Sequence, residues 1–360
     1  MNLAIFWLLA AALPDGSQTT PKNYLNDPFV PQGTITSLNL PECWPQYYNR
    51  GPLDFSPKDK SSKLVILGSG MPVGNPYRFG PAHVLIVKGF PYFVDCGEGW
   101  FRALTKATIT QGAMDLNPVF AADNLKYLFI THLHEDHTVG IPSFLLGPLK
   151  FHSRVDKKIY GPKGIASMVA HIDGAWKVDR EEMFEGPLHV PPGGDIATGI
   201  EINPDVEFPG PIFEDDNVKV EAFQTVKSHG ALKYTYAYRF TTKPDGRIIA
   251  FGGDGHYSKG LVEAAKGADI LVIEGITKKN IKYAPWGGKT VEEKLKNIGA
   301  YHMFPDMLKK VQHESGVKQI VMVHEQNYNS PEDYSRLGLQ KEMEEAGVKN
   351  IFSSCDGDMY

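Results

Sequence analysis

Short apolar runs alternate with glycine-rich turns along most of the chain after residue 62. Ten of these runs have the length and β-branched or aromatic content of buried strands. Four amphipathic stretches predict helices instead. The predicted strands lie at 63–70, 83–89, 91–99, 125–132, 157–164, 218–226, 234–242, 246–254, 269–275 and 318–326, and the helices at 99–107, 141–151, 258–268 and 303–316.

The order of these elements predicts an α/β fold. Strands dominate the beginning of this region, and helices and strands alternate later. The continuous apolar run in 125–132 is typical of a strand covered on both faces. We therefore expect a sandwich with sheets inside and helices outside.

The N-terminal region differs in composition from the rest. An apolar run from Leu3 to Leu13 is too short to span a bilayer, and it ends in small residues. It resembles the apolar core of an export signal, although no Lys or Arg precedes it; a buried N-terminal segment is the alternative. We expect a signal peptide at 1–20, an irregular arm at 21–62, and periplasmic or secreted localisation. The sequence shows no membrane span.

Charge and cysteine content argue against several classes of protein. The net charge of −5 provides no global basic field for nucleic acid. Three cysteines without CxxC spacing allow at most one disulfide and no cysteine zinc cluster. Residues 172–216 hold twelve acids against two basic residues, so we interpret them as an acidic surface insertion.

The stretch "THLHEDH" at 131–137 contains the strongest chemical signal. His132 and His134 alternate at the end of a predicted strand, and Asp136 and His137 follow where a helix begins. Imidazole and carboxylate ligands together suit zinc, iron or manganese, and zinc is the usual ion of hydrolytic sites. A solvated loop has no reason to place three histidines at this spacing behind a buried strand.

Three further candidate ligands stand in the same context. His229, Asp254 and His324 each follow or end an apolar strand. Strand ends gather at one edge of an α/β fold, so these side chains are expected to meet the histidine cluster. Each residue alone is weak evidence, and the repeated context is what supports the set.

With this set of motifs the chain resembles the metallo-β-lactamase fold superfamily, and within it the branch of ribonuclease Z and arylsulfatase-like hydrolases. The similarity runs from about 63 to 330. The motifs that resemble the superfamily's are "ILGSGMP", "VDCGEG", "THLHEDH", "SHGALKYTYAYRF", "GGDG", "ADILVIEG" with "YHMF", and "VMVHEQNY". The resemblance implies an αββα sandwich of two mixed sheets flanked by helices, in a hydrolase domain at 63–360.

The resemblance also implies roles for individual residues. One Zn²⁺ would be held by His132, His134 and His229, and a second by Asp136, His137 and His324, with Asp254 between them; Mn or Fe remain alternatives. The two ions would generate a bridging hydroxide. Asp136 counts among the catalytic residues, and His302, oriented by Glu274, would donate a proton to the leaving group.

Three features depart from ribonuclease Z. Only 25 positions separate His229 from Asp254, which leaves no room for the tRNA-binding arm that ribonuclease Z commonly carries there. The acidic insertion would repel a phosphate backbone. Export would remove the enzyme from tRNA.

On these grounds we expect an exported dinuclear zinc hydrolase that cleaves a small-molecule ester of sulfate or phosphodiester type, without a nucleic-acid partner. The alternatives are a β-lactam-hydrolysing relative, a ribonuclease Z-type tRNA 3′ endonuclease, and a non-catalytic metal-binding scaffold. The sequence leaves open whether the chain forms a homodimer.

Overall fold

The computed structural model describes most of the chain after residue 60. The described residues are 61–73, 78–104, 120–187, 189, 193–194, 196–203, 208, 210–226, 229–328 and 337–360. The predicted export signal at 1–20 lies outside them, as does all but the end of the predicted arm at 21–62. The description below concerns the compact unit that spans Pro41–Tyr360. No helix in its described part is long and apolar enough to cross a bilayer.

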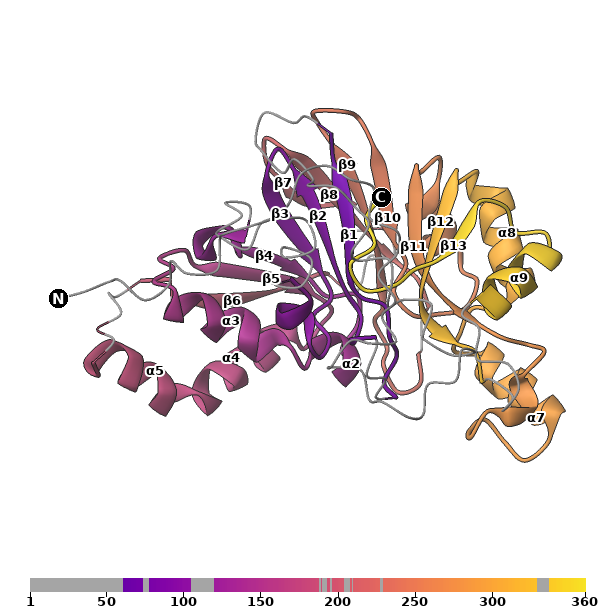
Figure 1. Cartoon of the computed structure of the whole chain (residues 1–360), viewed down its shortest axis with the longest axis horizontal. Coiled ribbons are helices and arrows are strands. Elements are labelled where there is room, and N and C mark those ends of the chain that lie inside the picture. The colour runs from indigo at the N-terminus through magenta and orange to yellow at the C-terminus, as the bar shows by residue number, and fades with distance from the viewer. Residues whose placement is uncertain are drawn as a thin grey trace, which may run out of the picture. The chain divides into compact units, whose positions relative to one another are not determined.

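Two mixed β-sheets form the centre of this unit (Figure 1). In the first sheet the order is β1-β2-β3-β4-β5-β6, antiparallel up to β3 and parallel beyond it. Its strands are β1 Lys63–Gly68, β2 Ala82–Val87, β3 Phe90–Val94, β4 Tyr127–Phe129, β5 Lys157–Gly161 and β6 Ala197–Glu201.

The second sheet has the order β13-β12-β11-β10-β9-β8-β7. Pairing is antiparallel from β7 to β10 and parallel from β10 to β13. Its strands are β7 Gly210–Glu214, β8 Val218–Gln224, β9 Tyr236–Thr242, β10 Ile248–Phe251, β11 Ile270–Ile276, β12 Gln319–Gln326 and β13 Ile351–Ser353.

Helices cover the outer faces of both sheets, so the predicted αββα sandwich is confirmed. Helices α3 and α4 lie on the side of the first sheet, and α8 and α9 on the side of the second (Figure 1). The helices are α2 Glu135–Thr138, α3 Ile141–Lys150, α4 Ile165–Ala175, α5 Lys177–Glu185, α6 Lys259–Ala265, α7 Val291–Gly299, α8 Pro305–Ser315 and α9 Leu337–Glu345, with short 3₁₀ turns η4 Ala122–Asn124 and η5 Ile281–Tyr283.

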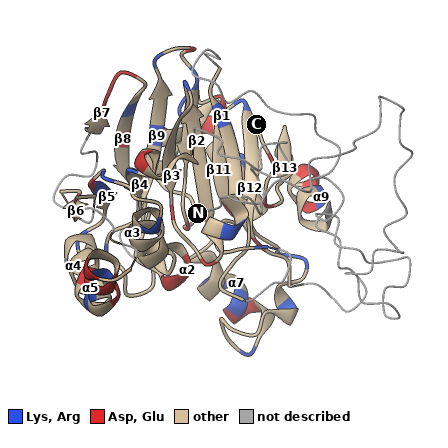
Figure 2. Cartoon of the chain, turned by 60° about the vertical axis from the view of Figure 1, so that its left-hand side comes forward, with Lys and Arg blue, Asp and Glu red and all other residues tan. Residues whose placement is uncertain are grey.

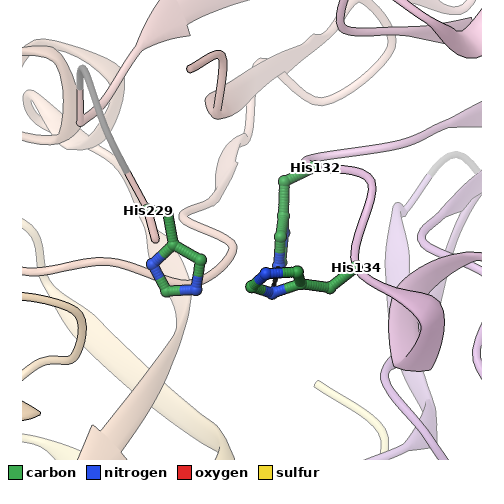
Figure 3. Close-up of side chains that lie close together, drawn as sticks. All are labelled: His132, His134 and His229. Atoms are coloured by element: carbon green, nitrogen blue, oxygen red, sulfur yellow. Dashed lines mark hydrogen bonds between the residues drawn. The ribbon is translucent and has the colours of Figure 1, made fainter. Parts of the chain in front are cut away.

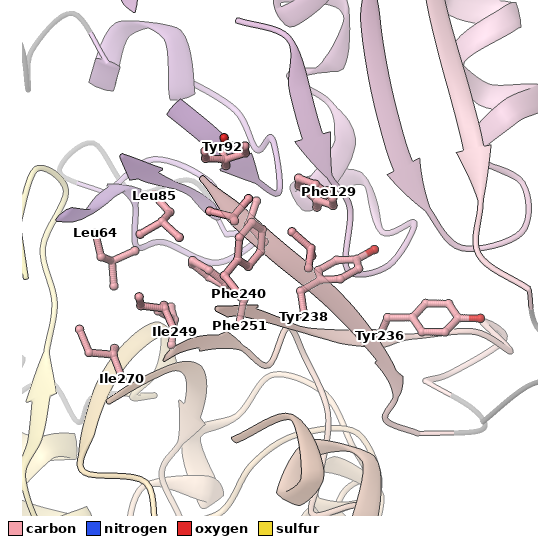
Figure 4. Packing of buried hydrophobic residues seen from close by; sticks show 14 of the residues in the cluster. Leu64, Leu85, Tyr92, Phe129, Tyr236, Tyr238, Phe240, Ile249, Phe251 and Ile270 are labelled. Atoms are coloured by element: carbon pink, nitrogen blue, oxygen red, sulfur yellow. The ribbon is translucent and has the colours of Figure 1, made fainter. Parts of the chain in front are cut away.

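Strand alternation creates separate cores on the two faces of each sheet. In β1, Leu64 and Ile66 face the second sheet, whereas Val65 and Leu67 pack under the helices. The core between the sheets is rich in aromatic rings, among them Phe129, Phe240 and Phe251 (Figure 4). Phe240 makes edge-to-face contacts with Phe129 and Phe251 at centroid distances of 5.2 and 5.4 Å. This packing fixes where the strand ends meet.

The range predicted as an acidic insertion, 172–216, is part of the sandwich rather than a separate flap. It contains α5 and the edge strands β6 and β7, one in each sheet. The two strands are only partly buried, so their sequences lack the apolar alternation of a covered strand. Figure 2 shows mixed red and blue on α5, and in Figures 1 and 2 this helix and α7 lie on opposite sides of α2.

Phe240→Ala should lower the free energy of unfolding by about 3–5 kcal/mol, because it leaves a cavity among rings that cannot close in. The matched control is Phe352→Ala on β13, whose ring is 44% exposed and whose loss should cost less than about 1 kcal/mol. Chemical denaturation of both variants, followed by circular dichroism, measures the difference. Equal losses would show that the core between the sheets does not carry the stability assigned to it.

Candidate metal centre

The histidine motif lies on the connection between β4 and α2. Strand β4 ends at Phe129, and His134 is the residue that precedes the first turn of α2. The hydroxyl of Tyr238 on β9 donates a hydrogen bond of 2.6 Å to the Ile130 carbonyl, which ties this connection to the second sheet. The rings of His132 and His134 lie together, with His132 Nε2 3.1 Å from His134 Nδ1.

His229 joins these two rings from the connection between β8 and β9. Its backbone N–H donates to the Leu232 carbonyl, and the reciprocal hydrogen bond forms as well. The ring centroid of His229 lies 5.3 Å from that of His132 and 4.8 Å from that of His134. Figure 3 shows the three rings turned toward one another. Their donor atoms lie within 4.8 Å of each other.

The second predicted ligand group, Asp136, His137 and His324, also comes together. His324 Nε2 lies 3.1 Å from Asp136 Oδ2. Asp254, three residues beyond the end of β10, lies between the groups: its Oδ2 is 3.3 Å from His324 Nε2 and its Oδ1 is 3.5 Å from His137 Nε2. All seven residues predicted as metal ligands therefore surround one place.

A β-bulge in β12 aims His324 into this place. In the pairing of β11 with β12, Glu274 is opposite Val323 and Gly275 is opposite Glu325, so His324 is the extra residue. Its backbone has a φ of 45°, a left-handed conformation that is strained for a residue with a side chain. Its N–H donates to the Ser69 carbonyl, and Ser69 is in turn held by the carboxylate of Asp356. The sequence indicated a ligand at the end of a strand, and the structure places it inside one.

Asp95 is a residue of the site that sequence reasoning missed. It follows β3, has a φ of 57°, and is buried. Its carboxylate accepts hydrogen bonds from the backbone N–H and the hydroxyl of Thr131 and lies 2.8 Å from His137 Nδ1. A carboxylate in this position fixes which ring nitrogen of His137 faces the other donors. The signal was present in "VDCGEG", which was quoted as a motif without a role for its acid.

His83 on β2 was also missed, and nothing in its strand-like sequence marks it. Its ring is buried, stacks on Phe251 at 5.9 Å, and lines a small cavity with Asp95, Asp254 and His324. Burial, with His137 and His324 nearby, lowers the pKa of His83 to about 3. It is therefore a neutral ring behind the ligand groups.

Burial and charge divide the histidines into two kinds. Burial lowers the pKa of His229 to about 4 and holds the pKa of His132 well below its usual range. Burial acts in the same direction on His324, but Asp254 and Asp136 outweigh it and raise the pKa of His324 to about 9. The carboxylates Asp136, Asp95 and Asp254 likewise raise the pKa of His137. The carboxylate side of the cluster thus stabilises positive charge.

Glu274 and His302 lie beside the cluster as a hydrogen-bonded pair. Glu274 Oε2 is 2.6 Å from His302 Nδ1, and Glu274 Oε1 accepts from the backbone N–H of Gly255. Burial raises the pKa of Glu274 and lowers the pKa of His302 to about 4, so the pair tends toward its neutral forms. The ring of His302 lies 5.5 Å from that of His229. Both predicted partners are thus at the site and in contact.

The spacing of the ligand nitrogen and oxygen atoms suits a bound metal ion better than it suits hydrogen bonds among the side chains. Among the described residues, the buried His137 Nε2 and His229 Nδ1 have no hydrogen-bond partner. Ligand atoms around a zinc ion lie roughly 3–3.5 Å apart, since each bond to zinc is about 2.0–2.2 Å long. The contacts of 3.1–3.5 Å between His132, His134, Asp136, His137, Asp254 and His324 match that spacing. A cation would also offset the buried carboxylates.

The site and the sandwich define a class. The chain belongs to the metallo-β-lactamase superfamily, because the model of the beta-lactamase superfamily domain matches residues 92–324. The protein is a metal-dependent hydrolase of this superfamily.

Within the superfamily the chain lies in the ribonuclease Z-like branch. It is 27% identical over 267 residues to a ribonuclease Z of Mycobacterium avium (strain 104), covering 73% of this chain and 85% of that one. It is 26% identical over 306 residues to a ribonuclease Z of Ignicoccus hospitalis, covering 74% and 88%. The structure of human tRNase Z, short form, shares the fold with a TM-score of 0.56 and 20% identity, over 83% of this chain and 98% of that chain.

These relatives overturn two expectations from the sequence. A small ester as substrate and the absence of a nucleic-acid partner are both wrong as leading interpretations, because the matching relatives are named as ribonucleases. The sequence-based prediction was wrong because it used the net charge of the whole chain and not the charge near the metal centre. Residues 277–300 carry six lysines and two glutamates, and in Figures 1 and 2 the acidic helix α5 lies across α2 from α7.

Asp95→Asn should weaken metal binding by about 10- to 100-fold, since the amide no longer holds His137 as the carboxylate does. The matched control is Asp215→Asn, which changes a carboxylate bonded to the Tyr92 hydroxyl in the β7–β8 turn. Competition against a chromogenic chelator measures both affinities. If the two variants bind metal alike, Asp95 has no part in orienting the site.

Proposed function

We propose that the chain is a ribonuclease Z-type endonuclease that binds two zinc ions and cleaves a phosphodiester bond of precursor tRNA near its 3′ end. The observation that carries the proposal is the convergence of two ligand groups, linked by Asp254, with the Glu274–His302 pair at their edge. The curated relatives named ribonuclease Z support the substrate class.

The roles of the residues follow from their places. His132, His134 and His229 would hold one ion, and Asp136, His137 and His324 the other, with Asp254 between them. Two ions so placed supply an activated water and neutralise charge on the phosphoryl oxygens. Asp95, which accepts hydrogen bonds from Thr131, holds the ring of His137. The hydrogen bond from the His324 N–H to the Ser69 carbonyl holds the backbone of His324.

His302 is placed to handle a proton at the leaving group. Its Nδ1 faces Glu274 and Gln326, with contacts of 2.6 and 3.2 Å. Glu274 keeps the ring in one orientation, so that a proton on His302 can move to the departing ribose oxygen. Glu274 acts through His302 and is a positioning residue.

The proposal is tested with a precursor tRNA transcript that carries a 3′ trailer. The metal-loaded protein should release the trailer, a chelator should stop the reaction, and added zinc should restore it. Asp254→Ala should lower the rate by at least about 10³-fold, because it removes the group between the two ions. The matched control, Asp216→Ala at an exposed position of the β7–β8 turn, should cleave like the wild type. An uncut transcript with two metals bound per chain contradicts the proposal.

His302→Ala should lower kcat on the transcript by about 10²- to 10⁴-fold with little change in KM. The loss should shrink to less than about tenfold on bis(p-nitrophenyl) phosphate, since p-nitrophenolate leaves without a proton. Comparing the two substrates for His302→Ala and Asp254→Ala separates proton donation from metal binding. Equal losses on both substrates would assign His302 to the metal site itself.

Export from the cytoplasm stays a prediction from residues 1–20. An exported enzyme would meet RNA outside the cell, whereas a retained one would meet tRNA precursors during their maturation. N-terminal sequencing of the protein isolated from its native cells decides between the two.

A further inference from the structure

The structure assigns a base-stacking subsite at the edge of the metal centre to Trp286 and Tyr301. We propose that it binds an unpaired nucleotide next to the scissile phosphate. The inference rests on the proposed function, because it names how a ribonuclease of this kind would hold the RNA at the cleavage point.

The rings of Trp286 and Tyr301 lie next to the histidines at the edge of the metal centre. The ring centroid of Tyr301 lies 5.7 Å from that of His229, and that of Trp286 lies 5.5 Å from that of His302 and 6.2 Å from that of Tyr301. Trp286 is 38% exposed, which leaves a large part of the indole open to a ligand. A base stacked there would place its own phosphate within reach of His302.

Hydrogen bonds hold Trp286 in place before any ligand arrives. Its Nε1–H donates to the Tyr328 hydroxyl at 2.6 Å, and that hydroxyl donates to Gln326 Oε1 at 2.7 Å. Gln326 lies on β12, two residues beyond His324, and its amide contacts His302. A ring that is already fixed loses little conformational entropy on binding. The same chain of contacts links the subsite to the proton-handling histidine.

Trp286 lies in a positively charged segment, which is the charge that attracts an RNA backbone. Residues 277–300, which include η5 and α7, carry six lysines and two glutamates. Lys278 and Lys279 pair with acids. Exposed Lys282, Lys289 and Lys296 have no carboxylate partner among the ion pairs of the described residues. Figure 2 shows blue ribbon segments, with some red, on and near α7.

Aromatic faces combined with unpaired lysines are the chemistry of single-stranded nucleic-acid binding. Every base has a π-face, so stacking works without regard to sequence, and the lysines attract the backbone. A base inside a duplex is already stacked on both sides and has no free face to offer. We therefore expect the subsite to prefer unpaired nucleotides, such as those at the 3′ end of a tRNA acceptor stem.

Trp286→Ala should raise KM for the precursor transcript by about 5- to 100-fold, which corresponds to the loss of one base–aromatic stack. The value of kcat should change by less than about threefold. Trp286→Phe should recover most of the loss because it keeps a stacking face. Trp176→Ala is the matched control, since this tryptophan is 40% exposed at the junction of α4 and α5, away from the metal centre, and it should behave as the wild type.

Binding is measured separately with the non-cleaving Asp254→Ala protein and a short single-stranded oligonucleotide. The oligonucleotide should quench tryptophan fluorescence, and Trp286→Ala in the same background should remove that quenching and weaken binding. A duplex of equal length should bind both proteins alike.

Two results would overturn the subsite: affinity and KM unchanged in Trp286→Ala, or a fall in kcat at constant KM, which would mean that Trp286 acts only through His302. If the wild type leaves every transcript uncut, the proposed function fails. The oligonucleotide measurement then still decides whether Trp286 stacks a base.

Discussion

The structure depends on keeping several charges out of water at one edge of a sandwich. Asp95, Asp136, Asp254 and Glu274 are all buried there, and isolated buried carboxylates are costly. Imidazole rings, backbone N–H groups and the Thr131 hydroxyl offset part of that cost, and the raised pKa values of His137 and His324 show that the pocket still favours positive charge. A bound metal cation would complete this balance, so the fold and the chemistry share one electrostatic requirement.

The backbone is strained at two residues of this buried, charged site. Asp95 and His324 both have left-handed backbone conformations although neither is glycine. Such strain persists only where the surroundings overdetermine the conformation, as the paired sheets do here. Gly97 shows how tight the packing is, since a Cβ there would lie 2.4 Å from the Asp136 carbonyl oxygen. The rigid strands thus fix the positions of the short connections that hold the metal-ligand side chains.

Much of the fold and the ligand set was predictable because the physics was local. Continuous or alternating apolar runs marked the buried strands, and "THLHEDH" placed four donors in six positions. Asp254 and His324 were recognisable from their place after or within such runs. The edge strands β6 and β7 were missed because one face of each meets water and leaves no clear pattern. Asp95, His83 and Trp286 gain their meaning only from contacts across the fold, which no spacing in the sequence records.

The substrate was misjudged for a related reason. Net charge and the acidic stretch 172–216 are sums over the chain, whereas a ligand meets one surface. In the net charge of the chain, acids that lie elsewhere in the fold cancel the lysines of 277–300. An arm was sought only between His229 and Asp254, so the basic segment between Glu274 and His302 went unnoticed. Charge becomes informative about a partner once it is assigned to a face.

The segment 355–360 has a consequence for how the enzyme comes into being. It extends the first sheet, because Leu64 and Ile66 donate hydrogen bonds to the carbonyls of Tyr360 and Asp358, and Asp356 holds Ser69 against the bulge of β12. These contacts join residues roughly 290 positions apart. The supports of His324 are therefore completed late in synthesis, only after almost all of this sequence has left the exit tunnel of the ribosome.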